Sequence, residues 1–198
     1  MNVSLIDYGT GNLHSLKKAL ESGGATVRVD TALTEARDAA AIVLPGVGAF
    51  GAAAAQLGSG RLALQETIQA GVPCLGICLG MQLLFEASEE GEGVGLGILP
   101  GQVRKLRAHR LPHMGWNEVE MMDDPLFAGI AQLTAYYANS YAAYPSDESE
   151  VIAWTHYEGE RFPAAVRRDR VWGVQFHPEK SGAAGLHLIG NFLAQVVR

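Results

Sequence analysis

The sequence predicts an α/β fold with a central, largely parallel twisted sheet flanked by helices, and an antiparallel, strand-rich second half. Three observations predict it. Short aliphatic runs alternate with longer helical patterns up to about Ala87, closely spaced strand-like runs follow Gly93, and glycine accounts for 24 of 198 residues. Alternating strands and helices are typical of a parallel sheet with helices on both faces, whereas short strands joined by tight turns pair antiparallel. We expect one domain over residues 1–198, because no linker or repeat interrupts the pattern.

The first half of the chain supplies the predicted parallel strands. Four short runs, rich in aliphatic residues and bounded by turn residues, fit strands: Val3–Ile6, Ala25–Val29, Ala41–Leu44 and Val72–Ile77. The helical spacing of Leu13, Leu16 and Leu20 predicts a helix between the first two strands. The long Ala-rich stretch Ala52–Ala70 predicts a second, single helix, because alanine has the highest helix propensity.

The second half supplies the predicted antiparallel strands and a closing helix. The strand-like runs are Gly97–Leu106, Trp116–Met122, Thr134–Tyr137, Val151–Tyr157, Ala164–Arg168 and Val171–Phe176. A last helix is predicted over Ala183–Val197. It is expected to turn Leu186, Ile189, Phe192 and Leu193 towards the core.

Composition and charge exclude several classes of function. A net charge of −6 is unsuited to electrostatic binding of nucleic acid. The amino end lacks the basic and apolar regions of a secretory signal, and the most apolar run, Val72–Phe85, is too short and too often interrupted to span a membrane. We therefore expect a cytoplasmic protein. The two cysteines, Cys74 and Cys78, have no His or Cys cluster beside them, so we expect no metal site and no cofactor.

The run Gly76-Ile77-Cys78-Leu79-Gly80 lies between a predicted strand and a predicted helix over Leu79–Glu86. It matches the G-x-S-x-G nucleophile elbow with cysteine in the place of serine. Paired glycines allow the sharp turn that exposes a nucleophile at the carboxyl end of a parallel strand, where open α/β sheets place their sites. A lone cysteine is more often a small core residue. The glycines favour a nucleophilic Cys78, whereas Cys74, inside the strand, is expected in the core.

A base for this thiol is predicted much further along the chain, at His177-Pro178-Glu179. Pro178 biases His177 away from the helical region, and in an extended chain residues two apart project from the same face. Glu179 is therefore expected to hold one imidazole nitrogen while the other faces Cys78, as in a nucleophile–base–orienter triad. On its own, this segment would better fit a turn with a solvated His and Glu; together with the elbow it favours the triad.

The segment after the third strand, Leu44-Pro45-Gly46-Val47-Gly48, is the candidate oxyanion hole. Backbone N–H groups of Gly46, Val47 and Gly48 could stabilise negative charge beside Cys78, although an ordinary strand-to-helix turn is the alternative. The Gly-rich run Gly9–Asn12 lacks the G-K-[ST] ending of a phosphate loop and is expected to be a turn. The remaining histidines receive no catalytic or metal role: His14, His109, His113, His156 and His187.

The run from Leu75 to Gln82, together with Phe176–Glu179, resembles the class I (triad) glutamine amidotransferase family. The resemblance implies a flavodoxin-like fold and hydrolysis of L-glutamine to glutamate and ammonia. It makes Cys78 the nucleophile, His177 the general acid and base, and Glu179 its orienting partner. It further assigns the oxyanion-hole and substrate-side backbone to Gly48 and Leu79, and contacts with bound glutamine to Gln82, Ser140 and Tyr141.

Four further stretches resemble one branch of that family, whose members pass ammonia to a barrel-shaped cyclase subunit in histidine biosynthesis. They are Ile6–Leu13, Leu44–Gly48, Pro112–Asn117 and His177–Gly182. The resemblance implies a heterodimer with the cyclase, with Asn12, Trp116 and Lys180 at the interface. The chain departs from the expected His-Ser-Tyr at Asn139, which can form hydrogen bonds but cannot act as an acid or base. The neighbouring Tyr136 and Tyr137 are expected to pack in the core.

Three alternatives stay open on the sequence. A related triad amidotransferase would keep the chemistry but serve pyridoxal phosphate, anthranilate or nucleotide synthesis. A catalytically inactive binding subunit would keep the fold alone, and a stand-alone thiol peptidase or γ-glutamyl hydrolase would need no partner. A partner is expected on chemical grounds, because free ammonia in neutral water is mostly ammonium, which is not a nucleophile.

Overall fold

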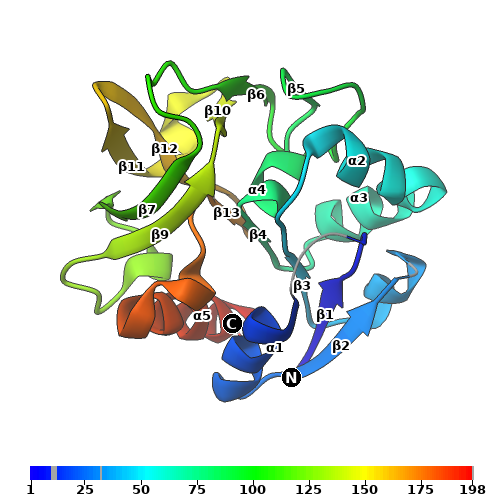
Figure 1. The fold of residues 1–198 in the computed structure, drawn as a ribbon. Helices are drawn as coiled ribbons and strands as arrows, with labels where there is room; N and C mark the ends of the chain where they lie inside the picture. The colour runs from blue at the N-terminus through cyan, green and yellow to red at the C-terminus, as the bar shows by residue number, and fades with distance from the viewer. Residues whose placement is uncertain (10–12, 32, 198) are drawn as a thin grey trace.

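The computed structural model describes residues 1–9, 13–31 and 33–197, and its centre is an eight-stranded sheet (Figure 1). The strand order is β2-β1-β3-β4-β13-β12-β11-β8. The five strands from β2 to β13 run parallel, and β12, β11 and β8 continue the sheet antiparallel. The strands are β1 Asn2–Ile6, β2 Thr26–Asp30, β3 Ala41–Leu44, β4 Cys74–Ile77, β8 Glu120–Met121, β11 Val151–Tyr157, β12 Glu160–Arg168 and β13 Val171–Val174. The predicted fold class, a mixed sheet with a parallel half and an antiparallel half, is confirmed.

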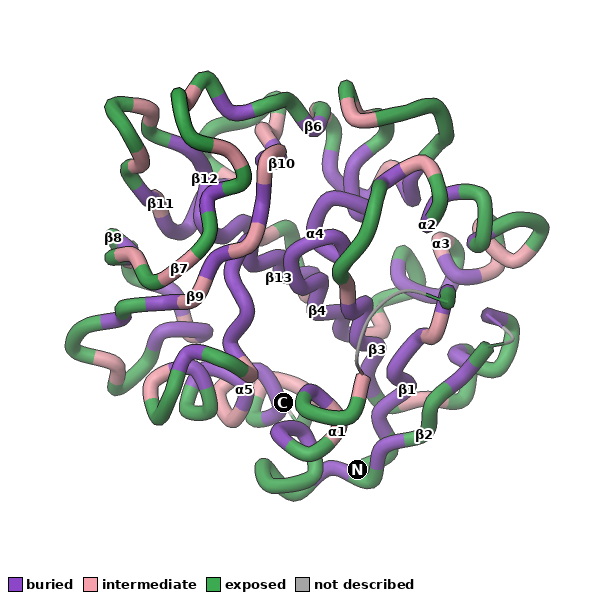
Figure 2. Tube along the Cα trace, viewed as in Figure 1, coloured by how far each residue is buried: buried purple, intermediate pink, exposed green. Residues whose placement is uncertain are grey.

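Helices cover both faces of the parallel half. α1 (Leu13–Ser22) and α5 (Gly182–Val196) pack on one face, and α2 (Phe50–Leu57), α3 (Arg61–Gln69) and α4 (Leu79–Leu83) lie on the other (Figure 1). β3 shows why both faces are covered: its four residues, Ala41–Leu44, are all buried and contribute alternately to the two apolar clusters. The buried trace of Figure 2 accordingly runs through the middle of the molecule.

Two smaller sheets stand beside the antiparallel half. One has the order β10-β6-β5, from Tyr141–Pro145, Gly101–Lys105 and Ala87–Ser88; the other pairs β7 (His113–Glu118) with β9 (Thr134–Asn139). Short 3-10 helices complete the description: η1 Leu33–Asp38, η2 Gly58–Gly60, η3 Pro125–Phe127, η4 Glu148–Glu150 and η5 Pro178–Lys180. No helix within the described residues combines the length and the apolar character needed to cross a bilayer.

Two expectations about helices were wrong. The stretch Ala52–Ala70 is not one helix, because η2 separates α2 from α3. Gly58 there has a φ of 44°, and a Cβ on Gly60 would lie 2.8 Å from the Cβ of Leu33, so the chain turns where only glycine fits. In α5, Leu186 is 47% exposed. It follows the buried Gly185 and is rotated roughly 100° from it, away from the core-facing side of the helix.

Candidate active site

Cys78 lies at the sharp turn between β4 and α4. Its φ of 51° and ψ of −106° are unusual for a residue with a side chain, a conformation that costs about 1–3 kcal/mol and is typical of active sites. The flanking glycines are required by contact: a Cβ on Gly76 would lie 2.6 Å from the carbonyl oxygen of Gly80, and one on Gly80 would lie 1.9 Å from that of Leu44. The Cys78 backbone N–H donates to the carbonyl of Val174 at 2.7 Å, which ties the turn to β13. The thiol is therefore held at the end of the central strand.

His177 and Glu179 follow β13, the parallel neighbour of β4. Nδ1 of His177 lies 2.9 Å from Oε1 of Glu179, and the two side chains are only 3% and 8% exposed. His177 itself is extended, with a φ of −101°, as expected before proline. The Glu179 contact, however, is made through the 3-10 turn η5 and not through extended chain, which corrects the predicted local geometry. The segment is fixed from both sides, because the His177 N–H donates to the carbonyl of Tyr136 and its carbonyl accepts from the Ser181 hydroxyl.

The imidazole of His177 interacts with both the carboxylate and the thiol. Burial lowers the pKa of His177, but hydrogen bonding and charge interaction with Cys78 and Glu179 outweigh burial and raise it to about 9. Glu179 occupies Nδ1, so the buried Nε2 is the nitrogen left for Cys78; it has no hydrogen-bond partner among the described residues. A histidine with this pKa is protonated at neutral pH, so the site favours an imidazolium beside the sulfur.

A hollow of about 160 Å³ opens next to Cys78. It is smaller than the pocket of a drug-sized ligand, about 300–1,000 Å³, which suits a small substrate. Most residues predicted to form the oxyanion hole or to contact substrate line it: Val47, Gly48, Leu79, Gln82, Ser140 and Tyr141. Gly46 does not. It lines an adjoining hollow that also touches His177 and Glu179, and a Cβ on it would lie 2.5 Å from the Cβ of Leu79.

A chain of amide hydrogen bonds runs beside the nucleophile. Nε2 of Gln82 donates to the carbonyl of Tyr141 at 3.0 Å and to Oε1 of Gln175 at 3.2 Å. Nε2 of Gln175 in turn donates to Sγ of Cys78 at 3.6 Å. Sequence analysis did not single out Gln175. Its available signal was a polar residue within the apolar run Val174–Phe176 at the end of a central strand, two residues before His177.

The predicted interface residues lie close to this site. The Trp116 side chain is 58% exposed on β7, and its ring centroid is 6.0 Å from that of Tyr136. Nζ of Lys180 lies 5.6 Å from the centre of the same Tyr136 ring. Tyr136 is half-buried at this surface and not in the core as predicted, whereas Tyr137 is buried as predicted. Asn12 lies outside the described residues.

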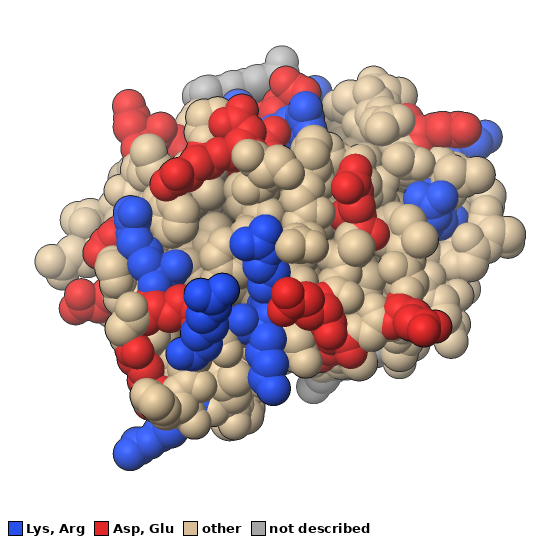
Figure 3. Space-filling model, turned by 90° about the horizontal axis from the view of Figure 1, so that it is seen from above, with Lys and Arg blue, Asp and Glu red and all other residues tan. Residues whose placement is uncertain are grey.

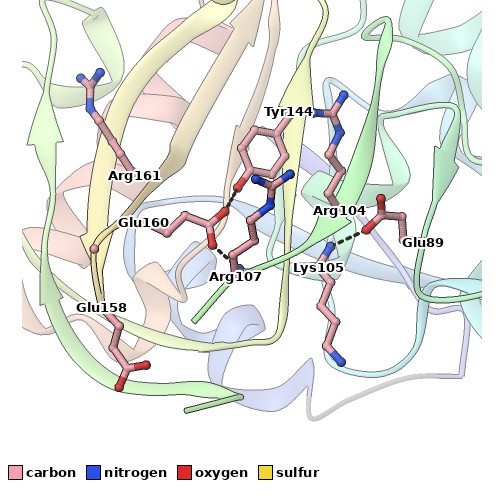
Figure 4. Close-up of a pocket in the computed structure, with 9 residues that line it drawn as sticks. Glu89, Arg104, Lys105, Arg107, Tyr144, Glu158, Glu160 and Arg161 are labelled. Atoms are coloured by element: carbon pink, nitrogen blue, oxygen red, sulfur yellow. Dashed lines mark hydrogen bonds between the residues drawn. The ribbon is translucent and has the colours of Figure 1, made fainter. Parts of the chain in front are cut away.

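A larger hollow, of about 590 Å³, lies away from Cys78 and is lined largely by charged side chains (Figure 4). Its carboxylates are already engaged: Glu89 accepts from the backbone N–H of Lys105, and Glu160 accepts from the hydroxyl of Tyr144 and the backbone N–H of Arg107. It offers no nucleophile paired with a base, so the smaller hollow is the better candidate. The face seen in Figure 3 mixes acidic and basic side chains without a field of one sign.

The described histidines and acids do not form a metal centre. Within residues 1–9, 13–31 and 33–197, no group of three His, Cys, Asp or Glu side chains is placed to hold an ion. His113 instead stacks between Tyr137 and Tyr157, with ring centroids at 4.7 Å and 3.9 Å, and burial lowers its pKa to about 4. It is a neutral core histidine.

A thiol at a glycine-flanked elbow, paired with a buried His and Glu on a mixed α/β sheet, defines a thiol-dependent hydrolase or acyl-transfer site. The family model described as "Glutamine amidotransferase class-I" matches residues 4–196, so the chain belongs to that family of enzymes. Within it, the chain belongs with the relatives named "Imidazole glycerol phosphate synthase subunit HisH".

The similarity to these relatives extends over nearly the whole chain. The relative from Synechococcus elongatus is 45% identical over 204 residues, covering 98% of this chain and 93% of the relative. The relative from Halobacterium salinarum is 46% identical over 202 residues, covering 97% and 92%. The family predicted from the sequence is confirmed.

Solved structures agree on the fold. "Crystal structure of glutamine amidotransferase" superposes with a TM-score of 0.79 at 19% identity, covering 99% of each chain. "Structure of PurLQS from Thermotoga maritima" superposes with a TM-score of 0.77 at 19% identity, covering 98% of each. At this identity the likeness concerns the fold alone.

Proposed function

We propose that the protein is the glutaminase subunit of imidazole glycerol phosphate synthase, acting in histidine biosynthesis. The observation that carries the proposal is the buried imidazole of His177, which interacts with the Cys78 thiol and is held at Nδ1 by Glu179. The full-length similarity to HisH subunits supports this synthase over the amidotransferases of other pathways.

In the proposed reaction, the Cys78 thiolate attacks the side-chain amide carbon of L-glutamine. Backbone N–H groups of Val47, Gly48 and Leu79, which line the same hollow, stabilise the oxyanion. The imidazolium of His177 protonates the leaving ammonia, and a glutamyl thioester remains. The now neutral His177 takes a proton from water, which attacks the thioester and releases glutamate, while Glu179 keeps the ring oriented.

Gln82, Ser140 and Tyr141 are proposed to contact the bound glutamine, because all three line the hollow. Gln82 already uses its amide nitrogen within the protein, so its Oε1 is the atom proposed to face the substrate. Asn139 lines the same hollow and donates to the carbonyl of Tyr141 at 3.0 Å. We assign Asn139 a hydrogen-bonding role there and no proton transfer.

The proposed partner is the cyclase subunit of the synthase, in a heterodimer. It would use the ammonia to make imidazole glycerol phosphate and aminoimidazole carboxamide ribotide. Large apolar side chains are exposed beside the site, with Met114 at 66% and Trp116 at 58%, and Lys180 adds a cation next to them. A solvent-facing aromatic and methionine pair is typical of protein interfaces. Asn12 stays a predicted interface residue.

We further propose that residues 1–198 form a single amidotransferase domain located in the cytoplasm. The proposed reaction is an acyl transfer followed by hydrolysis and contains no redox step. A thiol, an imidazole and backbone donors supply all of its proton transfers and charge stabilisation. We therefore propose that it needs neither a metal nor an organic cofactor.

The test is to mix the purified chain with a cyclase subunit and follow glutamate release with and without the phosphoribulosyl nucleotide that the cyclase consumes. The proposal predicts low release from the chain alone and strong stimulation by the cyclase with its nucleotide. Cys78→Ala should abolish the stimulated release. Full activity without any partner, or stimulation only by the synthase of another pathway, would contradict the assignment.

A further inference from the structure

Gln175 is a fully buried amide whose two polar atoms are both committed. Its side chain is 0% exposed, between the end of β13 and His177. Its Oε1 accepts from Nε2 of Gln82 at 3.2 Å, and its Nε2 donates to Sγ of Cys78 at 3.6 Å. A buried amide is costly unless it is hydrogen-bonded, so this side chain is held in place by these two contacts.

The orientation of the Gln175 amide follows from its partner. Gln82 presents an N–H group to Gln175, because its Nε2 also donates to the carbonyl of Tyr141, which can only accept. Gln175 must therefore turn its oxygen to Gln82 and its own N–H to the sulfur. The side-chain oxygen of Gln175 is therefore not available to accept a hydrogen bond from a neutral S–H group of Cys78. In this contact the Cys78 sulfur accepts a hydrogen bond, and the hydrogen bond is strongest when the sulfur is negatively charged.

We propose that Gln175 is a positioning residue for the nucleophile: its amide N–H favours the thiolate form of Cys78 and fixes the sulfur between Gln175 and His177. Only the effect of Gln175 on catalysis rests on the proposed function; its effect on the Cys78 sulfur does not. The backbone at Cys78 is already fixed by the glycine elbow, and the Gln175 contact restricts what remains free, the position of Sγ. A fixed and charged sulfur raises the fraction of molecules ready to attack the amide.

Several titratable groups surround the sulfur besides Gln175. His177 interacts with it directly, with Glu179 behind the ring. Buried Tyr8 lies within range of the charges of both Cys78 and Cys74, and Glu90 lines the hollow. A change at position 175 leaves all of these in the protein, so a change in the pH dependence of Cys78 in a folded Gln175→Met variant reports on the amide, whereas Gln175→Glu adds a charge of its own.

The test measures how fast iodoacetamide alkylates Cys78 as a function of pH, with the modified site identified by mass spectrometry. The variants are Gln175→Met, which keeps the size but removes the donor, and Gln175→Glu, which replaces the donor with an acceptor. The matched control is Gln132→Met on the exposed surface. Melting curves establish that each variant is folded.

We expect both position-175 variants to need a higher pH for the same alkylation rate, by on the order of one pH unit, or about tenfold slower alkylation at neutral pH. The control should match the wild type. With glutamine as substrate and the cyclase present, kcat should fall by a similar factor. Folded variants whose alkylation profile matches that of the wild type would overturn the inference.

A second measurement keeps residue 175 unchanged, in case both variants fail to fold. The side-chain amide protons of Gln175, followed by NMR, should shift with pH together with the ionisation of Cys78, and the shift should vanish in Cys78→Ala. An amide signal insensitive to Cys78 would refute the contact. Because neither measurement needs glutamine or a partner, failure of the proposed function and failure of this inference give different results.

Discussion

The substitution Glu179→Gln tests how the buried carboxylate sets the working pH of His177. The variant keeps the size of the side chain and an oxygen that can accept from Nδ1, but it removes the negative charge 2.9 Å from the ring. Both side chains are almost completely buried, at 3% and 8% exposure, so solvent screens the pair weakly. The negative charge of Glu179 therefore acts on the His177 ring with little screening.

The magnitude follows from the pKa of His177. Raising it from 6.5 to about 9 corresponds to about 3 kcal/mol in favour of the imidazolium, shared between Cys78 and Glu179 after burial is overcome. Cys78 is the larger contributor and Glu179 the smaller, and Glu179→Gln should lower the pKa of His177 by on the order of one unit. The imidazolium protonates the leaving ammonia, so activity is lost as pH rises through this pKa. The alkaline fall in activity should move to lower pH by the same amount.

The assay is kcat/KM for glutamine hydrolysis by the complex with its cyclase between about pH 6 and pH 10, because kcat/KM reports the ionisations of the free enzyme. The measured values belong to the coupled Cys78–His177 pair. We expect the shifted alkaline limb together with a roughly 10- to 100-fold lower maximum. An alkaline limb at the wild-type pH in a folded Glu179→Gln variant would refute the role given to the carboxylate.

Three further predictions concern the elbow and the core. Cys78→Gly should be more stable than Cys78→Ala by on the order of 1 kcal/mol, and so melt at a higher temperature, because glycine relieves the strain at a φ of 51°; both should be inactive. Equal melting temperatures would contradict this. Gly80→Ala should destabilise the protein by more than about 2 kcal/mol in chemical denaturation, since the new Cβ would lie 1.9 Å from the Leu44 carbonyl oxygen, whereas Gly190→Ala, where that space is open, should have little effect. Between pH 6.5 and about 4 the unfolded chain binds a proton at His113 that the buried, neutral His113 of the folded protein does not, so acidification costs stability on the order of 1–3 kcal/mol. His113→Gln should remove this part of the acid-induced loss of stability. An unchanged dependence of stability on pH would show that His113 is protonated in the fold.

Sequence patterns predicted four of the five parallel strands, because each is a short run rich in aliphatic residues with its own turn residues. The fifth, β13, was expected among the antiparallel strands, but it pairs parallel with β4 and antiparallel only with β12. The patterns failed where a tertiary contact decides. The alanines of the 52–70 stretch favour helix, but Gly58, with a positive φ, and Gly60, packed against Leu33, break it. β10 escaped prediction because Ala142, Ala143 and Pro145 have little strand propensity, and the strand depends on pairing with β6.

The residues of the candidate site likewise include some that the sequence could predict and some that it could not. Cys78, His177 and Glu179 could be predicted because glycine and proline mark the turns that present them. Gln175 could not, because its importance lies in what surrounds a buried amide, which a linear pattern does not show. Gly46 was grouped with Val47 and Gly48 as a neighbour in sequence, yet it lines only the adjoining hollow and not the one beside Cys78.

The proposed chemistry depends above all on the coupling between the Cys78 sulfur and the His177 imidazole. The most direct measurement is a pH titration of the His177 ring nitrogens by NMR in the wild type and in Cys78→Ala. The ring should stay protonated to about pH 9 in the wild type and lose its proton at clearly lower pH once the sulfur is removed. A ring that titrates near pH 6.5 in both proteins would contradict this coupling.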